Sequence, residues 1–398
     1  MFPRNWNLRT VEDLCLRITS GGTPKRSNPN YYEPGTIPWI KTADLNDAYI
    51  HQYSEYISEA GLRESSAKLL PANTVLMAMY GATVGMLGML TEEATCNQAS
   101  CALIADPAVC DHRWLFYALL NDRDFIISQA TGAAQQNLSG KTIRQFQYPT
   151  PPLKEQQAIA EVLGALDDKI ATNIKLGRSV EDLGAAHFSG LGLDVEPAGE
   201  GISLDSLFDF NPRRTVSSEN PTIIAMKDLP TATPLVEEWT TGSRKGGARF
   251  KNGDTLIARI TPCLENRKTA FVDFLGDGEV GIGSTEFIVM RSKNNLPLGV
   301  SYFMAISERF RDFAIQNLIG TSGRQRVSAA DLARHTISPV DATKLQEFGS
   351  WADDNLAFLG TLREENRTLA EIRDALLPPL MSGKLRVKDA EKVVEDAV

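Results

Sequence analysis

Apolar residues recur at spacings of three and four along two long stretches of the chain, which is the period of a helix with one buried face. The first stretch begins near Pro151-Pro152, where proline suits the opening turn of a helix, and it reaches about Phe188. Its stripe consists of Ile159, Leu163, Leu166, Ile170, Leu176, Val180 and Leu183, with Asn173 in its one polar place. The second stretch follows Asp341, a candidate N-cap, and is expected to end at Pro378-Pro379. Its stripe consists of Leu345, Phe348, Ala352, Leu359, Leu362, Leu369, Ile372 and Leu376.

Each stripe predicts a helix of about 35 residues, far longer than the mean of about 11 to 12. A single amphipathic helix most often packs on the core of its own domain. Here each helix follows a strand-rich region that should already form its own hydrophobic core. We therefore expect the two helices to pair with each other, antiparallel, so that each half presents the same faces to the same partner.

The regions ahead of the two helices repeat each other at an offset of about 181 to 189 residues. Both are rich in short apolar runs separated by Gly, Asn and Pro, a pattern typical of strands and turns. The matched pairs are residues 40–45 with 224–229, 72–77 with 253–258, 136–139 with 325–328, and 148–151 with 337–340. The predicted fold class is α+β, with two repeated mixed α/β domains, each followed by a long helix, and an antiparallel coiled coil of the two helices.

The pattern places five segments along the chain. They are a first domain over 1–152, a central helix and linker over 153–197, a second domain over 198–340, a distal helix over 341–378 and a tail over 379–398.

The composition is that of an ordinary globular protein, with 42% hydrophobic and 23% charged residues. No apolar run is long enough to span a bilayer and no signal pattern opens the chain, so we expect a cytoplasmic protein without a membrane partner. The five cysteines form no C-x-x-C pair and the four histidines are scattered. Reduced structural thiols and no metal site are therefore expected.

The net charge of -9 argues against a nucleic-acid binder. The charge is uneven, however: Lys+Arg against Asp+Glu is 12 to 14 in residues 1–152, 4 to 8 in 153–197, 17 to 16 in 198–340 and 8 to 12 in 341–398. Eight of the nine excess negative charges thus lie in the two helical segments. The two strand-rich domains are near neutral, so each can carry a local basic face, and a basic partner would have to help.

No motif for catalysis is complete. Ser139-Gly140-Lys141-Thr142 resembles the end of a phosphate-binding loop, but Gln135 stands where that loop needs glycine. Residues 274–278 resemble the glycine-rich loop of a methyltransferase, yet they lie between two strand-like runs, and a hairpin turn explains them better. The tetrapeptides that hold a flipped base for amino methylation and the carboxylate-lysine spacing of nucleases are absent, and residues 265–268 are only the nearest approach. We expect no catalytic residue on this chain.

What remains are clusters of side chains that suit a polyanion, and they recur at matching places in the two halves. Gln, Asn and Arg are the residues that make bidentate contacts to adenine and guanine edges, and Lys and Arg contact phosphates. Any one such cluster is more often a solvated loop, but recurrence in both halves favours function. The candidate DNA-binding residues are Thr23, Lys25, Arg26, Tyr31, Lys41, Gln135, Gln136, Asn137 and Lys141 in the first half, and Arg213, Arg214, Lys227, Arg244, Lys245, Arg259, Lys268, Arg324, Gln325 and Arg326 in the second.

Three stretches resemble the specificity subunits of Type I restriction-modification systems. They are Ser20-Gly21-Gly22-Thr23-Pro24, the Pro-Pro-Leu-x-Glu-Gln-Gln run at 151–157, and Leu-Leu-Pro-Pro-Leu-Met-Ser-Gly-Lys-Leu at 376–385. The resemblance covers nearly the whole chain in order. The second half departs from it, because Val340-Asp341-Ala342-Thr343-Lys344-Leu345-Gln346 replaces the Pro-Pro-x-x-Glu-Gln-Gln pattern.

The resemblance implies two target recognition domains that each read one half of a split, asymmetric double-stranded DNA sequence. It also implies two methyltransferase subunits docked on the helices, and restriction/translocase subunits. S-adenosylmethionine, ATP and Mg would be held by those partners and no cofactor by this chain. A helix of 36 residues would be roughly 54 Å long, more than the roughly 34 Å of one turn of duplex, so the pair would act as a spacer.

Three other functions remain open at this stage. The chain could serve a related system whose partner fuses methyltransferase and nuclease, which only the partner distinguishes. It could be a coiled-coil scaffold without a DNA role, which predicts no binding to any duplex. A stand-alone methyltransferase is disfavoured by the missing tetrapeptide.

Overall fold

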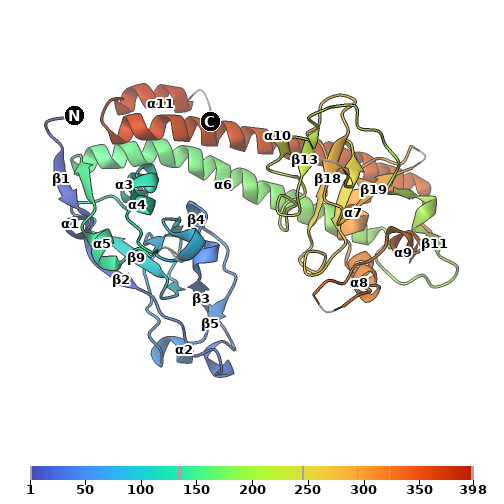
Figure 1. Ribbon diagram of the computed structural model, residues 1–398, viewed down its shortest axis with the longest axis horizontal. Helices are drawn as coiled ribbons and strands as arrows, with labels where there is room; N and C mark the ends of the chain where they lie inside the picture. Colours follow the sequence, from blue (N-terminus) through green and yellow to red (C-terminus); the bar gives the residue numbers. More distant parts are fainter. Residues whose placement is uncertain (1, 133–136, 244–245, 294, 322, 396–398) are drawn as a thin grey trace. The chain divides into compact units, whose positions relative to one another are not determined.

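The computed structural model describes residues 2–132, 137–243, 246–293, 295–321 and 323–395. The chain divides into two compact units. Unit 1 comprises residues 1–170 and 368–398, and unit 2 comprises residues 171–367. Each of the two long helices therefore contributes one part to each unit (Figure 1).

Unit 1 builds its sheets before the first long helix begins. Five strands pair in the order β2-β9-β6-β7-β4, three in the order β5-β3-β8, and β1 pairs with β10. The strands are β1 Asn7–Thr10, β2 Cys15–Ser20, β3 Ile37–Ile40, β4 Ala48–Ile50, β5 Tyr56–Ile57, β6 Val75–Ala78, β7 Leu87–Leu90, β8 Thr95–Cys96, β9 Ser100–Ala105 and β10 Gln147–Thr150. The helices are α1 Val11–Leu14, α2 Glu59–Arg63, α3 His112–Asn121, α4 Arg123–Ser128 and α5 Gly140–Arg144.

Unit 2 has a similar plan, but its two larger sheets have four strands each. Its sheets have the orders β12-β19-β16-β17 and β14-β13-β18-β15, and β11 pairs with β20. The strands are β11 Ile202–Ser203, β12 Phe208–Phe210, β13 Thr222–Ile224, β14 Thr240–Thr241, β15 Arg249–Phe250, β16 Thr255–Ala258, β17 Thr269–Phe271, β18 Gly281–Gly283, β19 Phe287–Ser292 and β20 Thr336–Ile337. The helices are α7 Val300–Ile306, α8 Glu308–Gln316 and α9 Ala329–Ala333.

The internal repeat is present in the strand pairing. Strands β6 and β9 pair antiparallel in unit 1 as β16 and β19 do in unit 2, and β3 and β8 pair parallel as β13 and β18 do. One predicted match is displaced by a residue. Val75 opposes Leu103 and Thr255 opposes Met290, so the offset at this strand is 180 rather than 181. The correction matters because a slip of one residue moves every side chain of a strand to the other face.

The run at 274–278 is not a hairpin turn, contrary to expectation. Strand β17 before it pairs with β16, and β18 after it pairs with β13 and β15 in the other sheet. The turn therefore carries the chain from one sheet to the next. Short runs of apolar residues do not reveal which strand each of them will pair with.

The first long helix, α6, spans Leu153–Gly190, and the second, α10, spans Ala342–Met381. Asp341 caps α10 as predicted, since its Oδ1 accepts hydrogen bonds from the backbone N–H groups of Thr343 and Lys344. The predicted end at Pro378-Pro379 is wrong, because α10 continues through both prolines. Leu380 and Met381 beyond them are buried in the core of unit 1, and this packing outweighs the helix-breaking tendency of proline.

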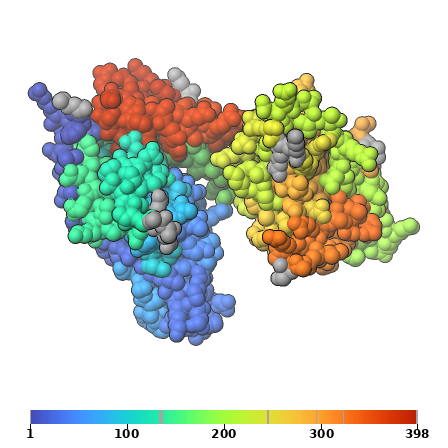
Figure 2. All heavy atoms as spheres, in the orientation of Figure 1, coloured from blue at the N-terminus to red at the C-terminus, as the bar shows by residue number. Residues whose placement is uncertain are grey.

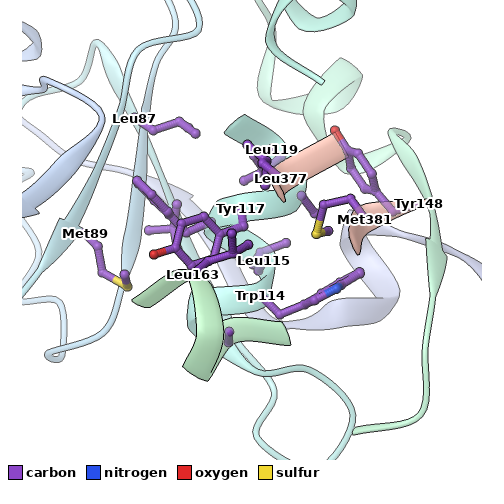
Figure 3. Close-up of a cluster of buried hydrophobic side chains, with 14 of the residues drawn as sticks. Leu87, Met89, Trp114, Leu115, Tyr117, Leu119, Tyr148, Leu163, Leu377 and Met381 are labelled. Carbon is purple, nitrogen blue, oxygen red and sulfur yellow. The ribbon is translucent and has the colours of Figure 1, made fainter. Parts of the chain in front are cut away.

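The core of unit 1 joins its sheet to its helices. Trp114, Leu115 and Tyr117 of α3 pack among Leu87 and Met89 of β7, Leu163 of α6 and Leu377 of α10 (Figure 3). The last helix, α11 Val387–Glu395, adds Ala390 and Val394 to the same core, and it lies beside the end of α10 (Figures 1 and 2). The helices are therefore integral to the unit that carries the strands.

The two long helices pair antiparallel in both units, as predicted. In unit 2 the Asn173 amide of α6 donates to Glu365 Oε2 at 2.8 Å and to Asn366 Oδ1 at 2.9 Å. Further along α6, the ring of Phe188 lies 5.4 Å from that of Phe348, which comes earlier in α10. In unit 1 Arg373 of α10 donates to Asp167 of α6 at 2.8 Å. Residue numbers thus increase along α6 where they decrease along the facing α10, as in an antiparallel pair.

The predicted seam of α6 holds in its first half and at Asn173 and Val180, and it is wrong at two leucines. Ile159, Leu163 and Leu166 are buried, but Leu176 and Leu183 are 42% and 60% exposed. The buried face there passes instead through two glycines, Gly177 beside Leu359 and Gly184 beside Phe303 and Trp351. A glycine lets a neighbouring element approach closely but adds nothing to the apolar pattern. The pattern therefore predicted burial at the nearby leucines, which lie on the exposed face.

The Pro-Pro-Leu-x-Glu-Gln-Gln run has a structural explanation. The buried Gln156 side chain donates to the carbonyl oxygens of Val109 and Pro151 and accepts from the backbone N–H of Asp111. It thereby fixes the loop before α3 to the start of α6. In unit 2 the corresponding Leu345 is simply buried.

Replacing Gln156 with alanine is expected to lower the free energy of unfolding by about 2 to 4 kcal/mol, because one buried and two part-buried backbone groups lose their partner. Gln157, the adjacent exposed glutamine, provides the matched control, and its alanine variant should stay within about 0.5 kcal/mol. Urea denaturation of both variants makes the comparison, and equal losses would contradict the structural role.

His335 of unit 2 gives the stability a pH dependence. Burial, together with the neighbouring Arg309 guanidinium, lowers the pKa of His335 to about 4. Between pH 4 and about pH 6.5, the usual histidine pKa, His335 is protonated in the unfolded chain but neutral in the folded chain. This stability is therefore complete above pH 6.5 and is lost as the pH falls toward 4.

At pH 5 the loss attributable to His335 should be about 2 kcal/mol relative to pH 7. The free energy of unfolding at the two pH values, measured for the protein and for His335→Gln, isolates this contribution from that of the carboxyl groups. If His335→Gln had the same pH dependence of stability as the original chain, His335 would not be its source.

All five cysteines are free, and burial raises the pKa of Cys96 and Cys101 to about 12, so these thiols stay protonated. Among the described residues, no helix combines the length and apolar character that a bilayer crossing requires.

Candidate nucleic-acid interface

The Ser-Gly-Gly-Thr-Pro run of unit 1 packs too closely for side chains at its glycines. A Cβ at Gly21 would lie 1.9 Å from the carbonyl oxygen of Cys96, and one at Gly22 would lie 2.2 Å from Ser66 Oγ. The Gly22 carbonyl also accepts from the buried Trp39 indole at 2.9 Å. This run therefore fixes the segment that carries the candidate residues Thr23, Lys25 and Arg26.

Arg26 is held in a defined position by its neighbours. Its guanidinium lies 4.8 Å from the ring centre of Tyr32 and 4.7 Å from that of Trp39, a cation–π arrangement. Glu55 pairs with both Arg26 and Lys41, and the hydrogen bond from Arg26 lowers the pKa of that carboxyl group. Two cations thus share one anion, which leaves a local positive charge at a partly exposed site.

The other candidates of unit 1 differ in their freedom. Lys25 and Lys141 are exposed, Thr23 donates to Gln98, and the Tyr31 hydroxyl lies 3.5 Å from Glu64. Lys141 belongs to α5, whose N-cap is Ser139, so the Ser-Gly-Lys-Thr run is a helix start.

A hairpin occurs at the same place in both units. In unit 1 Thr131 and Asn137 exchange two backbone hydrogen bonds, and in unit 2 Ile319 and Arg326 do the same. After each hairpin the chain bonds the end of a central strand, Leu138 to Met79 in unit 1 and Val327 to Arg259 in unit 2. Asn137 of the first predicted cluster and Arg326 of the second therefore occupy equivalent positions, whereas Gln135 and Gln136 lie outside the described residues.

The hairpin of unit 2 presents a mixed set of side chains. Arg324 is exposed, and so is Ile319, at 75%. Arg326 instead makes three hydrogen bonds to Glu286, which lower the pKa of that carboxyl group. The backbone of Gln325 is fixed by Thr261 through its N–H and its carbonyl oxygen.

A groove of about 670 Å³ opens in unit 2. Four arginines and no acidic residue are among the described residues that line it, together with Thr285 and Phe287. The arginines are Arg213, Arg214, Arg249 and Arg259. Arg244 and Lys245, which precede the lining residue Gly247, lie outside the described residues. A concave surface with this excess of cations suits a polyanion.

Arg214 needs a correction as a candidate phosphate contact. Its side chain is only 8% exposed and pairs through both terminal nitrogens with Asp254, which is fully buried. Asp254 also accepts from Arg291 at 2.8 Å. Arg214 therefore stabilises the interior of unit 2, whereas the adjacent Arg213 is exposed.

Two further candidates lie outside this groove. Lys227 is 84% exposed and stands beside Asp228, while the Lys268 ammonium donates to the carbonyl oxygen of Met226 at 2.8 Å. Lys227 is thus available to a ligand, and Lys268 fixes the backbone that carries it.

Thr285, which lines the groove, is not among the binding residues predicted from the sequence. The polar triplet Ser284-Thr285-Glu286 interrupts the apolar run from Gly281 to Met290, which had been interpreted as a single strand. In the structure this triplet separates β18 from β19. A polar break inside an apolar run was the signal that could have revealed this part of the groove.

Comparison with known proteins finds several similar specificity subunits. Residues 3–181 match the Type I restriction modification DNA specificity domain. The specificity subunit of the Type I restriction enzyme MjaIX from Methanocaldococcus jannaschii is 27% identical and aligns over 97% of this chain and 95% of its own. That of EcoR124I/EcoR124II from Escherichia coli is 29% identical over 37% of each chain.

A solved structure supports the fold. The specificity subunit of the Type I restriction-modification system from M. genitalium superimposes with a TM-score of 0.53, at 17% identity, over 94% of this chain and 96% of that one. The chain is therefore similar along nearly its whole length to the specificity subunits of Type I restriction enzymes, and residues 3–181 match their DNA specificity domain.

Proposed function

We propose that this chain recognises a bipartite, asymmetric DNA sequence, with unit 1 reading one half-site and unit 2 the other. The recurrence of a hairpin at the same position of both units carries this proposal. Each hairpin lies in a strand-rich unit that has its own core, so the two readings are separable. The arginine-lined groove of unit 2 and the Arg26-Lys41 pair of unit 1 supply phosphate contacts.

Two methyltransferase subunits dock on the long helices in this proposal, and restriction/translocase subunits join them. The exposed Leu176 and Leu183 of α6 support a docking role, because apolar side chains on a helix face favour a protein partner over water. Adenine methylation and ATP-dependent cleavage then belong to those partners, together with S-adenosylmethionine, ATP and Mg. This chain supplies the sequence recognition and no catalytic group.

The test is a map of methylated adenines in the genome of the host, before and after deletion of the gene for this chain. We expect one split motif to lose its methylation and to regain it when the gene is restored. The purified chain without partners should transfer no methyl group to DNA. An unchanged methylation map, or methyl transfer by the chain alone, would contradict the proposal.

A further inference from the structure

Arg259 is fixed by its backbone at the point where the groove of unit 2 meets the hairpin. It follows the last residue of β16, its N–H donates to the carbonyl oxygen of Glu286, and its carbonyl oxygen accepts from Val327. The residue is half-buried and lines the groove. Its position is thus set from both sides, by the start of β19 and by the end of the hairpin.

The guanidinium of Arg259 lacks the partners that its neighbours have. Its buried Nε has no hydrogen-bond partner within the described part of the chain. The nearby carboxylate of Glu286 is already occupied by Arg326 through contacts of 2.7 to 3.0 Å. The buried Nε atoms of Arg123, Arg178 and Arg311 share this feature, but of these four arginines Arg259 is the one that lines the groove, where its terminal nitrogens are available to a ligand.

The scaffold does not require an arginine at this place. Met79 is the equivalent residue of unit 1, since its carbonyl oxygen accepts from Leu138 as that of Arg259 accepts from Val327. Met79 is buried and apolar. The arginine is therefore particular to unit 2, as a residue that sets the specificity of one half-site would be.

A half-buried, pre-positioned guanidinium suits a base edge better than a phosphate. Exposed arginines such as Arg213 can reach phosphates at the surface of a duplex, and a point charge suffices for that contact. Guanine presents two adjacent acceptors, O6 and N7, in the major groove, and the planar fork of arginine matches both at once. Lysine keeps the charge but loses the fork.

We infer that Arg259 reads a guanine in the half-site recognised by unit 2, an inference that rests on the proposed function. Thr285 lines the same groove and would face the bases next to that guanine.

The experiment compares adenine methylation motifs in a host whose own copy of this gene is replaced by the original chain, Arg259→Ala, Arg259→Lys or Arg334→Lys. The original chain should give a motif with an invariant G·C pair in the half-site of unit 2. Both Arg259 variants should lose about 5- to 150-fold of the preference for that pair, while every other position of the motif stays the same. Arg334→Lys should leave the motif unchanged, because Arg334 is an exposed arginine of unit 2 that is not among the residues lining the groove.

The outcomes separate the inference from the proposal on which it rests. Absence of any split methylated motif with the original chain would overturn the proposed function. A split motif without a G·C pair in the half-site of unit 2 would overturn only the role of Arg259. So would an Arg259→Ala variant that weakens methylation of all sites alike while Arg259→Lys restores it, because that pattern marks a phosphate contact. Thermal unfolding of the purified variants verifies that each one is folded.

Discussion

Exchanging residues 1–150 for those of a relative is expected to change one half of the DNA target and to leave the other half and the spacing unaltered. Unit 2 keeps all of its own hairpin, groove and core in such a chimaera. The exchange also leaves both long helices in place. Each mismatched base pair costs about 1 to 3 kcal/mol, so three lost pairs should reduce affinity for the original sequence at least about 100-fold.

The structure decides which relative can donate the segment. Within unit 1, the Tyr117 hydroxyl donates to Asp167 of α6 at 2.5 Å, and the Trp6 indole donates to Glu155 at 3.2 Å. A donor that keeps Tyr117 and Trp6 preserves these contacts to the helix. The reciprocal exchange of residues 198–340 serves as the control, and the methylation map of each chimaera is the measurement. If either exchange altered both half-sites together, the separation of the two readings would be wrong.

Arg214→Ala should lower the free energy of unfolding of unit 2 by about 3 kcal/mol, because it leaves a buried carboxylate without its bidentate partner. Asp254 is fully buried and retains only Arg291 as an ion-pair partner in the variant. Arg213→Ala is the matched control one residue earlier. It should change the free energy of unfolding by less than about 0.5 kcal/mol.

In DNA binding, by contrast, Arg213→Ala should lose more affinity than Arg214→Ala. Arg213→Ala is expected to weaken binding of all sequences alike and to reduce the salt slope by about 1. The measurements are urea denaturation of the full chain and binding of the assembled complex at two salt concentrations. Trp239 and Trp351 report on unit 2 because both lie within it. A destabilised Arg213 variant beside a fully stable Arg214 variant would reverse our assignment.

Local signals in the sequence were sufficient for several elements. Asp341 caps its helix through its own side chain, and Asp228 fixes the turn after β13 as Asp44 fixes the one after β3. Such contacts span two or three residues, so residue type and spacing determine them. The repeat and the antiparallel helix pair follow from periodicities that persist over many residues, which individual exceptions do not obscure.

The candidate site was predictable only in part. The sequence predicted clusters of hydrogen-bond donors at equivalent places in the repeat, and the described members Asn137 and Arg326 do occupy equivalent positions; their contact with DNA stays a prediction. It did not predict which cation is exposed. Arg213 and Arg214 are adjacent and chemically identical, and Asp254, forty residues away, decides that the second one is buried.

The amino-acid sequence by itself therefore determined the class of elements, their order and their duplication. Helix period and capping depend on residues close together in the chain, and the repeat is visible when the two halves of the sequence are compared. Tertiary structure alone decided the exposed face of α6 at Leu183, the passage of α10 through Pro378 and the unpaired Nε of Arg259. Each of these depends on which distant groups fill the space around a side chain. Packing and ion pairing across the chain, rather than local propensity, set that environment.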